Sequence, residues 1–223
     1  MTLILSLETA TTNCSVALSK DGKIVSTRSI NSGFSHSEKI NIFIEQVIQE
    51  AGVFLKDLDA LAVSIGPGSY TGLRIGLSSA KGLCFGLDIP LIAVSTLEGM
   101  AVGIKALPKE LIIPMIDARR MEAYCAVYDE HHKLISQPEA IVIDENFYER
   151  FKNDSHLVLA GDGADKCISL FEDDYAIRVI PHYFPTAENI SIVAHQKFAV
   201  KDFENVSLIE PFYLKEYSSG KKP

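Results

Sequence analysis

The 223-residue sequence contains no tryptophan, and aromatic residues make up only 9% of it. No stretch approaches the roughly 18 consecutive apolar residues that a membrane-spanning helix needs, so we expect no membrane contact. The opening MTLILSLETATT has no basic segment before its short apolar run, and polar residues follow directly. It is therefore typical of a strand and not of a secretory signal.

Positive charge is scarce as well. The chain has 21 Lys and Arg against 29 Asp and Glu, which gives a formal net charge of -8. Sequence-independent binding of nucleic acid needs a basic surface, and no basic run is present in the sequence. We therefore expect any RNA to be held by a partner, so that this chain meets RNA only indirectly.

Cysteine is rare and has no metal-binding spacing. The four cysteines are far apart in the sequence, and none forms a CxxC pair; they are Cys14, Cys84, Cys125 and Cys167. This usage is typical of buried free thiols in a reducing compartment, and it disfavours a disulfide framework or a zinc site. We expect a cytoplasmic protein.

Histidine pairs with metal-ligand spacing are also missing. The six histidines are His36, His131, His132, His156, His182 and His195. None of them forms HxxH, HxxxH or HExxH, so two ligands cannot share one helix face, and a metallopeptidase is strongly disfavoured. No local pattern of Ser, Cys and His indicates a nucleophile, although spacing says nothing of residues that folding brings together. We predict no metal site and assign no catalytic residue.

Hydrophobic residues make up 47% of the chain, enough for one large core or two smaller ones. Their periodicity predicts the same order of elements twice, with three strands followed by alternating helices and strands. In the first half, the predicted strands are residues 3–7, 15–18, 23–30, 60–65 and 91–94, and the predicted helices are residues 35–51, 69–85 and 96–107. In the second half, the predicted strands are residues 111–116, 123–128, a segment from 133, 157–160 and 176–180, and the predicted helices are residues 146–152 and segments from 164 and 186. Ser35 and Glu38 form a capping-box pattern at the start of the helix predicted over residues 35–51.

A duplicated βββαβαβα order indicates two α/β lobes whose parallel strands are joined through helical crossovers. Such lobes resemble ribonuclease H and face one another across a cleft in the actin-like and sugar-kinase-like ATPase fold. The segment KALPKE breaks the apolar pattern near the middle of the chain. We therefore predict an N-terminal lobe over residues 1–106 and a C-terminal lobe over residues 107–223, with the last segment free to pack back on the first lobe.

Acidic residues close the first strand of each half, at Glu8 and Asp117. In active members of that fold, an acid and a glycine-rich hairpin at this place hold the phosphates of ATP. Here the first hairpin, ETATTNCS, is rich in hydroxyls, but the second, DARRMEAY, has arginines in place of glycines. The glycines of LAGDGAD fit an adenosine-binding turn as well as an ordinary strand-to-helix turn. The residues of this vestigial nucleotide site are Glu8, Thr11, Asp117, Gly161 and Gly163. A working ATPase or phosphotransferase stays open, as does a metal-dependent nuclease that uses Asp162.

Residues 64–86, SIGPGSYTGLRIGLSSAKGLCFG, look like a phosphate-binding loop that leads into a helix. A P-loop needs GxxxxGK[ST], and both the spacing and the lysine are missing. Ser69 is suited to cap the helix. Small residues then recur every four positions and mark one helix face without bulky side chains, at Gly72, Gly76, Ala80 and Cys84. Two interior glycines sacrifice about 2 kcal/mol of helix propensity, so we expect a close neighbour on this face, from this chain or from a partner.

Several quoted segments together resemble one family. The most specific is GPGSYTGLRIGLSSAKGL, and the others are LSLETATTNCSVAL, SHSEKI, IDARRMEAYCAVY, LAGDGA and EPFYLK. They resemble the TsaB (YeaZ) family of bacterial threonylcarbamoyladenosine biosynthesis proteins along essentially the whole chain. Two residues depart from that pattern, Glu8 where the family usually has Asp and Lys215 where it usually has Arg. Neither lies in the glycine-rich helix, so they weaken nucleotide binding and leave the resemblance intact.

The resemblance implies a non-catalytic paralogue of TsaD, the subunit that transfers the threonylcarbamoyl group to the adenosine beside the anticodon of certain tRNAs. It implies that the chain binds TsaD through two helices of the N-terminal lobe, that the small ATPase TsaE joins the assembly, and that the chain alone forms a homodimer. It implies no cofactor. The residues assigned to the partner surface are His36, Ile40, Phe43, Ile44, Tyr70, Gly72, Leu73, Gly76, Leu77 and Ala80. Ile42 lies off the main apolar face of its helix, which indicates a second buried surface there.

Overall fold

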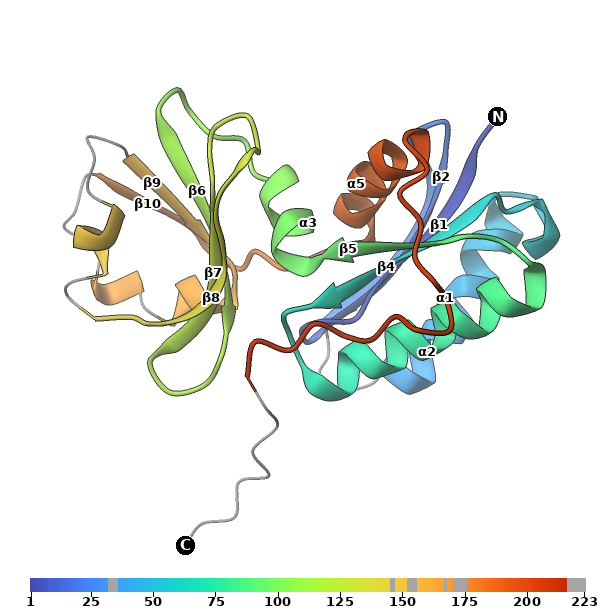
Figure 1. Cartoon of the computed structure of the whole chain (residues 1–223), viewed down its shortest axis with the longest axis horizontal. Helices are drawn as coiled ribbons and strands as arrows, with labels where there is room; N and C mark the ends of the chain where they lie inside the picture. Colours follow the sequence, from blue (N-terminus) through green and yellow to red (C-terminus); the bar gives the residue numbers. More distant parts are fainter. Residues whose placement is uncertain (32–35, 145–146, 152–155, 167, 171–175, 216–223) are drawn as a thin grey trace, which may run out of the picture.

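The computed structural model describes residues 1–31, 36–144, 147–151, 156–166, 168–170 and 176–215. Two five-stranded sheets lie side by side, and helices pack against them (Figure 1). The duplicated order of strands and helices is confirmed. Within the described residues, no helix is both long enough and apolar enough to cross a membrane.

The first sheet combines an antiparallel meander with two parallel strands, in the order β3-β2-β1-β4-β5. Its strands are β1 (Leu3–Glu8), β2 (Asn13–Lys20), β3 (Lys23–Asn31), β4 (Ala60–Gly66) and β5 (Leu91–Ser95). Side chains alternate along β1, so Leu3, Leu5 and Leu7 join one core cluster while Ile4 joins another. Both faces of β1 are therefore buried, which explains the continuous apolar run of this strand.

Helices from both halves of the chain cover this sheet. On the face of Leu5 lie α1 (His36–Glu50) and α2 (Tyr70–Leu87), and on the face of Ile4 lies α5 (Ala187–Ala199). The C-terminal half therefore contributes a helix to the first lobe. The division of the chain between residues 106 and 107 stays a prediction.

The second sheet repeats the arrangement in the order β10-β9-β6-β7-β8. Its strands are β6 (Glu110–Asp117), β7 (Glu122–Tyr128), β8 (Leu134–Val142), β9 (His156–Ala160) and β10 (Ile177–Ile180). α3 (Thr96–Val102) packs on one face through Leu97 and Met100. Phe147 fills the core on the other face. The remaining short elements are η1 (Leu55–Asp57), η2 (Tyr148–Phe151), α4 (Asp162–Asp165) and η3 (Ile168–Leu170).

The helix predicted over residues 96–107 ends early, at Val102. Gly103 follows, and a β-carbon there would overlap the side chains of Asn189 and Tyr183. These two side chains are bonded to one another, because the Asn189 amide donates to the Tyr183 hydroxyl at 3.0 Å. Packing between α3 and α5 therefore decides where the helix ends, and periodicity alone does not reveal it.

The helices predicted over residues 146–152 and from residue 164 are single turns, η2 and α4. Asn146 and Lys152, at the ends of the first prediction, lie outside the described residues, as do Ser35 of the predicted capping box and Cys167. The other three cysteines are buried free thiols, as predicted. Periodicity overestimated these helices because short apolar runs fit a buried turn as well as a helix.

The tail, residues 204–215, runs back along the first lobe and reaches the second (Figure 1). It pairs with the edge of β5 at its start. Phe212 then donates its N–H to the carbonyl of Ile65 in β4 at 2.7 Å. Lys215 forms an ion pair with Glu122 of β7. The tail therefore bonds to both sheets and links the lobes.

α2 packs against the loop that follows β1 at main-chain distance. The N–H of Ser69 donates to the carbonyl of Ala10 at 2.6 Å, and the Thr9 hydroxyl donates to the carbonyl of Gly72 at 2.8 Å. A β-carbon at Gly72 would overlap the carbonyl oxygen of Thr9, and one at Gly76 would overlap its hydroxyl oxygen. The close neighbour that the glycine stripe requires is therefore part of this chain.

Two glycines of α2 provide a matched test of this packing. Gly72→Ala is expected to lower the free energy of unfolding by about 1–3 kcal/mol, because the new β-carbon meets main chain that has to move. Gly82→Ala is expected to raise it by about 0.5–1 kcal/mol, because a β-carbon there meets nothing within 4 Å and alanine favours the helix. Urea unfolding measures both variants, and equal effects would contradict the packing role of Gly72.

Candidate functional site

Most residues that the sequence assigns to a partner surface lie inside the protein. The structure buries Gly72, Leu73, Gly76, Leu77 and Ala80 on α2 and His36, Ile40 and Ile44 on α1, and it leaves Phe43 and Tyr70 partly exposed. The glycine face of α2 therefore packs against this chain, and binding of a partner through these two helices stays a prediction. The loop after β1 already occupies that face, and the buried apolar residues of both helices pack on their own sheet.

The start of α2 does not form a phosphate-binding loop, as the missing lysine predicted. The Ser69 hydroxyl accepts a hydrogen bond from the N–H of Gly72 at 3.3 Å and caps the helix. The N–H of Ser69 itself donates to Ala10. A phosphate at a helix N-terminus needs such N–H groups to be available, and two of them are taken by the chain itself.

A different face of α2 is bare. Ser78, Gly82 and Gly86 also recur every four residues, and each follows a residue of the buried stripe by two positions. β-carbons at the two glycines would meet nothing within 4 Å. Beside them Phe85 is 87% exposed, and on α1 Ile42 is 46% exposed. We call these five residues, Ile42, Ser78, Gly82, Phe85 and Gly86, the outer helix face.

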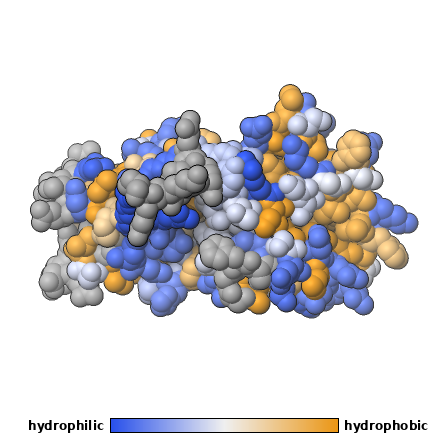
Figure 2. Space-filling model, turned by 90° about the horizontal axis from the view of Figure 1, so that it is seen from below, coloured by the Kyte–Doolittle hydropathy of each residue, from blue (hydrophilic) through white to orange (hydrophobic). Residues whose placement is uncertain are grey.

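The outer helix face has the composition of a protein-binding surface. A row of small residues lets a second helix approach closely, and exposed apolar side chains beside it gain from being covered. Figure 2, which views the molecule from below, shows hydrophobic residues among hydrophilic ones over the first lobe. The interval from Gly82 to Gly86 is visible in the sequence, but periodicity cannot tell which of two glycine rows faces the sheet.

Glu8 ends β1 but is closed off from solvent. Its side chain is fully buried, and Oε1 accepts hydrogen bonds from the N–H of Ala10 at 2.5 Å and from the Ser64 hydroxyl at 2.9 Å. Oε2 has no hydrogen-bond partner among the described residues. Burial raises the pKa of Glu8 to about 7, although these hydrogen bonds act in the opposite direction. A carboxyl group in this position cannot meet a nucleotide or a hydrated metal ion.

Asp117, the corresponding acid of the second lobe, is exposed but engaged. Its Oδ1 accepts a hydrogen bond from the N–H of Arg119 at 2.8 Å and forms an ion pair with Lys166 Nζ at 2.5 Å. The same ammonium group donates to the carbonyls of Arg120, at 3.0 Å, and of Glu122. A lysine therefore supplies the positive charge that a metal ion would bring to this carboxylate, and the residues do not fit a Mg²⁺ site.

The remaining residues of the predicted nucleotide site serve the fold. Thr11 is buried. Gly161 has a φ of 123°, and a β-carbon there would overlap the carbonyl oxygen of Met115 in β6. A β-carbon at Gly163 would lie 3.0 Å from the carbonyl carbon of Met115. Both glycines are buried where α4 sits directly on β6, so they offer no open turn to an adenosine.

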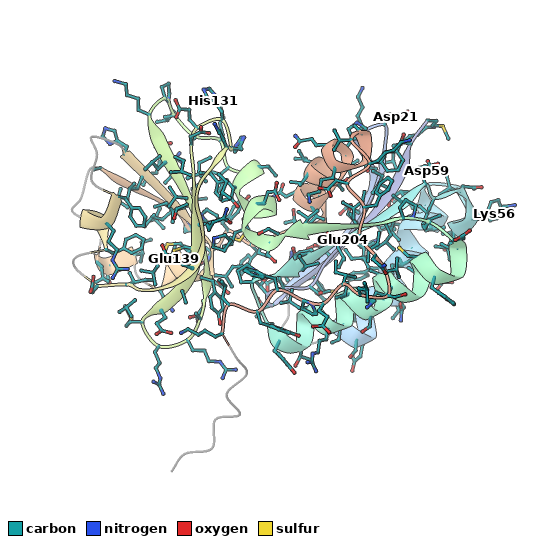
Figure 3. All side chains as sticks on the ribbon, viewed as in Figure 1. Asp21, Lys56, Asp59, His131, Glu139 and Glu204 are labelled. Carbon is teal, nitrogen blue, oxygen red and sulfur yellow. The ribbon has the colours of Figure 1, made fainter. Side chains whose placement is uncertain are left out.

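The five residues assigned to a vestigial nucleotide site therefore do not form an open site for ATP. Binding in this fold needs an accessible acid for Mg²⁺ and free main-chain amides around the phosphates. Among the described residues, no group of three or more His, Cys, Asp and Glu side chains could hold a metal ion. Figure 3 shows the labelled acids Asp21, Asp59, Glu139 and Glu204 scattered over both lobes.

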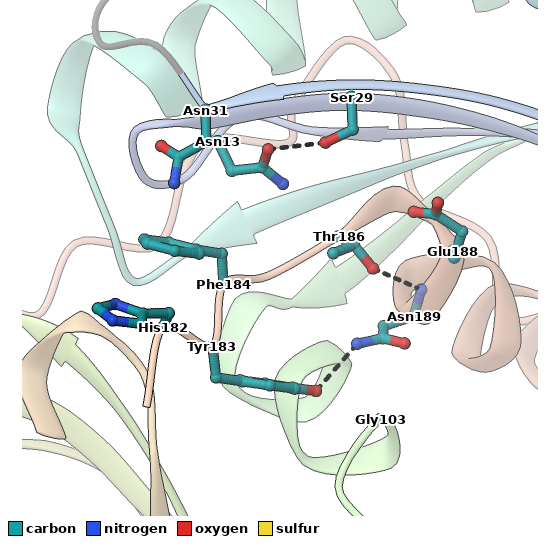
Figure 4. Close-up of a pocket in the computed structure, with 10 residues that line it drawn as sticks. All are labelled: Asn13, Ser29, Asn31, Gly103, His182, Tyr183, Phe184, Thr186, Glu188 and Asn189. Carbon is teal, nitrogen blue, oxygen red and sulfur yellow. Dashed lines mark hydrogen bonds between the residues drawn. The ribbon is translucent and has the colours of Figure 1, made fainter. Parts of the chain in front are cut away.

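A polar hollow of about 600 Å³ lies where the segment before α5 meets the ends of β2 and β3 (Figure 4). Asn13 bonds across it, because its amide donates to the carbonyl of Pro185 at 2.9 Å and its oxygen accepts from the Ser29 hydroxyl at 2.8 Å. Tyr183 and Asn189 form the bond described above on the other side. These polar groups bond to one another, so we interpret the hollow as a seam of the fold. No sequence pattern pointed to it.

The buried carboxyl group of Glu8 predicts a pH-dependent stability. Its pKa rises from 4.5 to about 7 on folding, so the folded state binds the proton more tightly than the unfolded state. The free energy of unfolding is therefore expected to fall by up to about 3 kcal/mol as the pH rises from 4.5 to 7, and then to level off.

Glu8→Gln removes this titration, so the decline should be much smaller in that variant. Urea unfolding at pH 5 and pH 8 measures both proteins, and Glu45→Gln, at an exposed position of α1, controls for the loss of one carboxylate. The same loss of stability in Glu8→Gln as in the unsubstituted protein would show that another group causes it.

Comparison with protein families matches residues 31–215 to the family described as TsaD, tRNA N6-adenosine threonylcarbamoyltransferase. The chain is 34% identical over 230 residues to the tRNA threonylcarbamoyladenosine biosynthesis protein TsaB of Escherichia coli (strain K12), an alignment that covers 98% of this chain and 97% of that protein. Among solved structures, it is similar to YeaZ from Pseudomonas aeruginosa, with a TM-score of 0.81 and 26% identity over 96% of this chain and 100% of that one.

A more distant structure shares the fold alone. Component A of the (R)-2-hydroxyglutaryl-CoA dehydratase of Acidaminococcus fermentans has a TM-score of 0.55 and 12% identity, and the match covers 89% of this chain and 100% of that one. The two ribonuclease H-like lobes of the actin-like ATPase fold, which the sequence predicts, are confirmed. Because the match to TsaB extends over nearly the whole chain at 34% identity, the chain belongs to the TsaB (YeaZ) family.

Proposed function

We propose that this chain is a non-catalytic subunit of an assembly that makes threonylcarbamoyladenosine in tRNA, in which it binds and supports a TsaD-like transferase. The outer helix face carries this proposal, because Gly82, Phe85 and Gly86 leave α2 bare and apolar where no part of the described chain covers it. The reaction is the one in the names of its relative from Escherichia coli and of the matched family.

The two acids at the strand ends support a non-catalytic role. Glu8 is sealed inside the first lobe, and Asp117 is neutralised by Lys166 in the second. An acid that is to bind a metal ion or to transfer a proton to substrate has to reach it. Both carboxyl groups instead bond to groups of their own chain.

The similarity to the TsaD family over residues 31–215 suggests how the two subunits meet. A TsaD-like protein with a lobe of the same fold would present an equivalent pair of helices. Two such pairs can pack face to face about an approximate two-fold axis, which buries the outer helix face of this chain. Two copies of this chain can pair in the same way, so we expect a homodimer that competes with the TsaD-like partner.

We expect the rest of the assembly to supply the chemistry. A TsaE-like ATPase would join it, and the TsaD-like subunit would hold the adenosine that is modified. The action of the whole assembly on tRNA would take place in the cytoplasm. This chain then needs no cofactor of its own.

Substitution of Gly82 by arginine tests the outer helix face. Gly82→Arg is expected to weaken association with the TsaD-like protein of the same organism by at least about 10-fold, which is about 1.4 kcal/mol, because the long side chain prevents close helix approach. The fold should tolerate it, since a β-carbon there meets nothing within 4 Å. Isothermal titration calorimetry measures the affinity, and thermal unfolding measures the fold.

Ile192→Arg is the matched control, because Ile192 is 43% exposed on α5, at the opposite face of the same sheet. It should leave association unchanged. If Gly82→Arg and the control bind equally well, the outer helix face is not the interface. If the unsubstituted chain does not associate with the TsaD-like protein at all, the scaffold function itself is wrong.

The alternative function, a stand-alone ATPase or phosphotransferase, makes a different prediction. It requires micromolar binding of Mg²⁺ and ATP by the isolated chain, weakened by Glu8→Gln or Asp117→Asn. We expect calorimetric titration of the isolated chain with Mg²⁺ and ATP to show no heat of binding. Glu8 at the end of β1 is buried, and Asp117 at the end of β6 is paired with Lys166. Measurable binding that depends on either acid would favour the alternative.

A further inference from the structure

The arginines differ in whether a carboxylate pairs with them. Arg28 and Arg178 each form an ion pair with a glutamate. In the part of the chain that the structure describes, four exposed arginines form no ion pair, namely Arg74, Arg119, Arg120 and Arg150. A guanidinium group that no carboxylate neutralises is available to an outside anion, and its flat array of donors suits a phosphate group.

Arg119 and Arg120 form the turn between β6 and β7 in a conformation that disfavours them. Their φ angles are 70° and 53°, in the left-handed region. A hairpin turn with two such residues usually contains Asn and Gly, because larger side chains are strained there. Folding alone therefore gives no reason for two arginines at this place, and neither guanidinium contributes an ion pair to the described structure.

The main chain of this turn is held firmly. The N–H of Arg119 donates to Asp117, and Lys166 donates to the carbonyl of Arg120 at 3.0 Å. The N–H of Glu122 donates to the carbonyl of Arg119 at 3.2 Å. These bonds hold the strained backbone, and the side chains of Arg119 and Arg120 are exposed to solvent.

Arg74 belongs to the same surface through the tail. Its Nε donates to the Tyr213 hydroxyl at 3.0 Å, and its Cζ lies 3.9 Å from the centre of the Tyr70 ring. The two tyrosine rings stack with centroids 5.1 Å apart. Two residues after Tyr213, Lys215 pairs with Glu122 beside the β6–β7 turn. We call Arg74, Arg119, Arg120 and Lys215 the basic surface.

The pictures place these elements together. Figure 1 shows the β6–β7 turn, the start of α2 and the end of the described tail at the lower side of the molecule. Figure 2, seen from that side, shows strongly hydrophilic residues over the second lobe.

The lysines beside these arginines pair with the nearby acids. Lys166 forms an ion pair with Asp117 and Lys215 forms one with Glu122, so these two lysines account for the two carboxylates in a chain of net charge -8. The expectation that the chain avoids RNA rested on the average charge, and the average does not describe this surface.

We propose that the basic surface binds the phosphodiester backbone of the tRNA, an inference that rests on the function proposed above. Arg119 and Arg120 would bind phosphates, and Arg74 with the stacked Tyr70 and Tyr213 would bind an adjoining nucleotide. An exposed aromatic ring favours RNA over an acidic protein segment, because a base can stack on Tyr213, which is 36% exposed. The subunit would thus help to position the substrate of its partner.

The test uses the complex of the full chain with the TsaD-like protein of the same organism and an unmodified tRNA transcript. Combined Arg119→Gln and Arg120→Gln are expected to weaken tRNA binding by about 10-fold near physiological salt and to reduce the slope of log K against log salt by about 2, one for each lost phosphate contact. Arg119→Lys with Arg120→Lys keeps the charge and should lose about 3-fold or less.

The matched control combines Lys105→Gln and Lys133→Gln, two exposed cations at the opposite end of the second lobe, near the labelled His131 of Figure 3. It should change neither the affinity nor the slope. Size-exclusion chromatography of each complex is run alongside. Complexes that assemble normally and bind tRNA like the unsubstituted one would overturn the RNA contact, and so would a double variant that folds but no longer assembles. Failure of the unsubstituted chain to assemble would instead refute the proposed function and the RNA contact together.

Discussion

The contact between α2 and the loop after β1 is the constraint on which the other features depend. Thr9 places its carbonyl and its hydroxyl against Gly72 and Gly76, where no β-carbon fits. This contact brings α2 down on the end of β1, where Glu8 is sealed from solvent. It also turns the second row of small residues, with Gly82 and Gly86, away from the sheet. The same packing therefore closes the end of β1 and leaves the outer helix face bare.

In neither lobe is the acid at the end of the first strand available to a ligand, and the physical reason differs between the two lobes. In the first lobe, desolvation opposes the charge of Glu8 and raises its pKa to about 7. In the second lobe, Asp117 stays exposed, but the ammonium group of Lys166 neutralises it and at the same time bonds to two carbonyls of the β6–β7 turn. Neither lobe therefore keeps an open acid at the end of its first strand.

The lobes share more of the chain than a simple division would allow. α5 follows the second sheet in sequence but packs on the first, and the tail bonds to β4 and β5 before it reaches Glu122 in the second lobe. The basic surface lies at this last crossing. Its arginines come from a helix of one lobe and a hairpin of the other, and the tail contacts Arg74 through Tyr213 and the strand after the hairpin turn through Lys215.

Composition, spacing and periodicity determined the order of the strands and helices, the two-lobed fold, the lack of a P-loop and the requirement for a close neighbour on the glycine stripe. Local patterns act over a few residues, which is why these features can be predicted from the sequence. Which chain supplies that neighbour, which glycine row faces outward, and whether Glu8 is open to solvent were decided by the tertiary structure. Each of these depends on contacts between residues far apart in the sequence, such as Thr9 with Gly72 across 63 positions and Glu8 with Ser64 across 56, and no local pattern carries information about a contact at that separation.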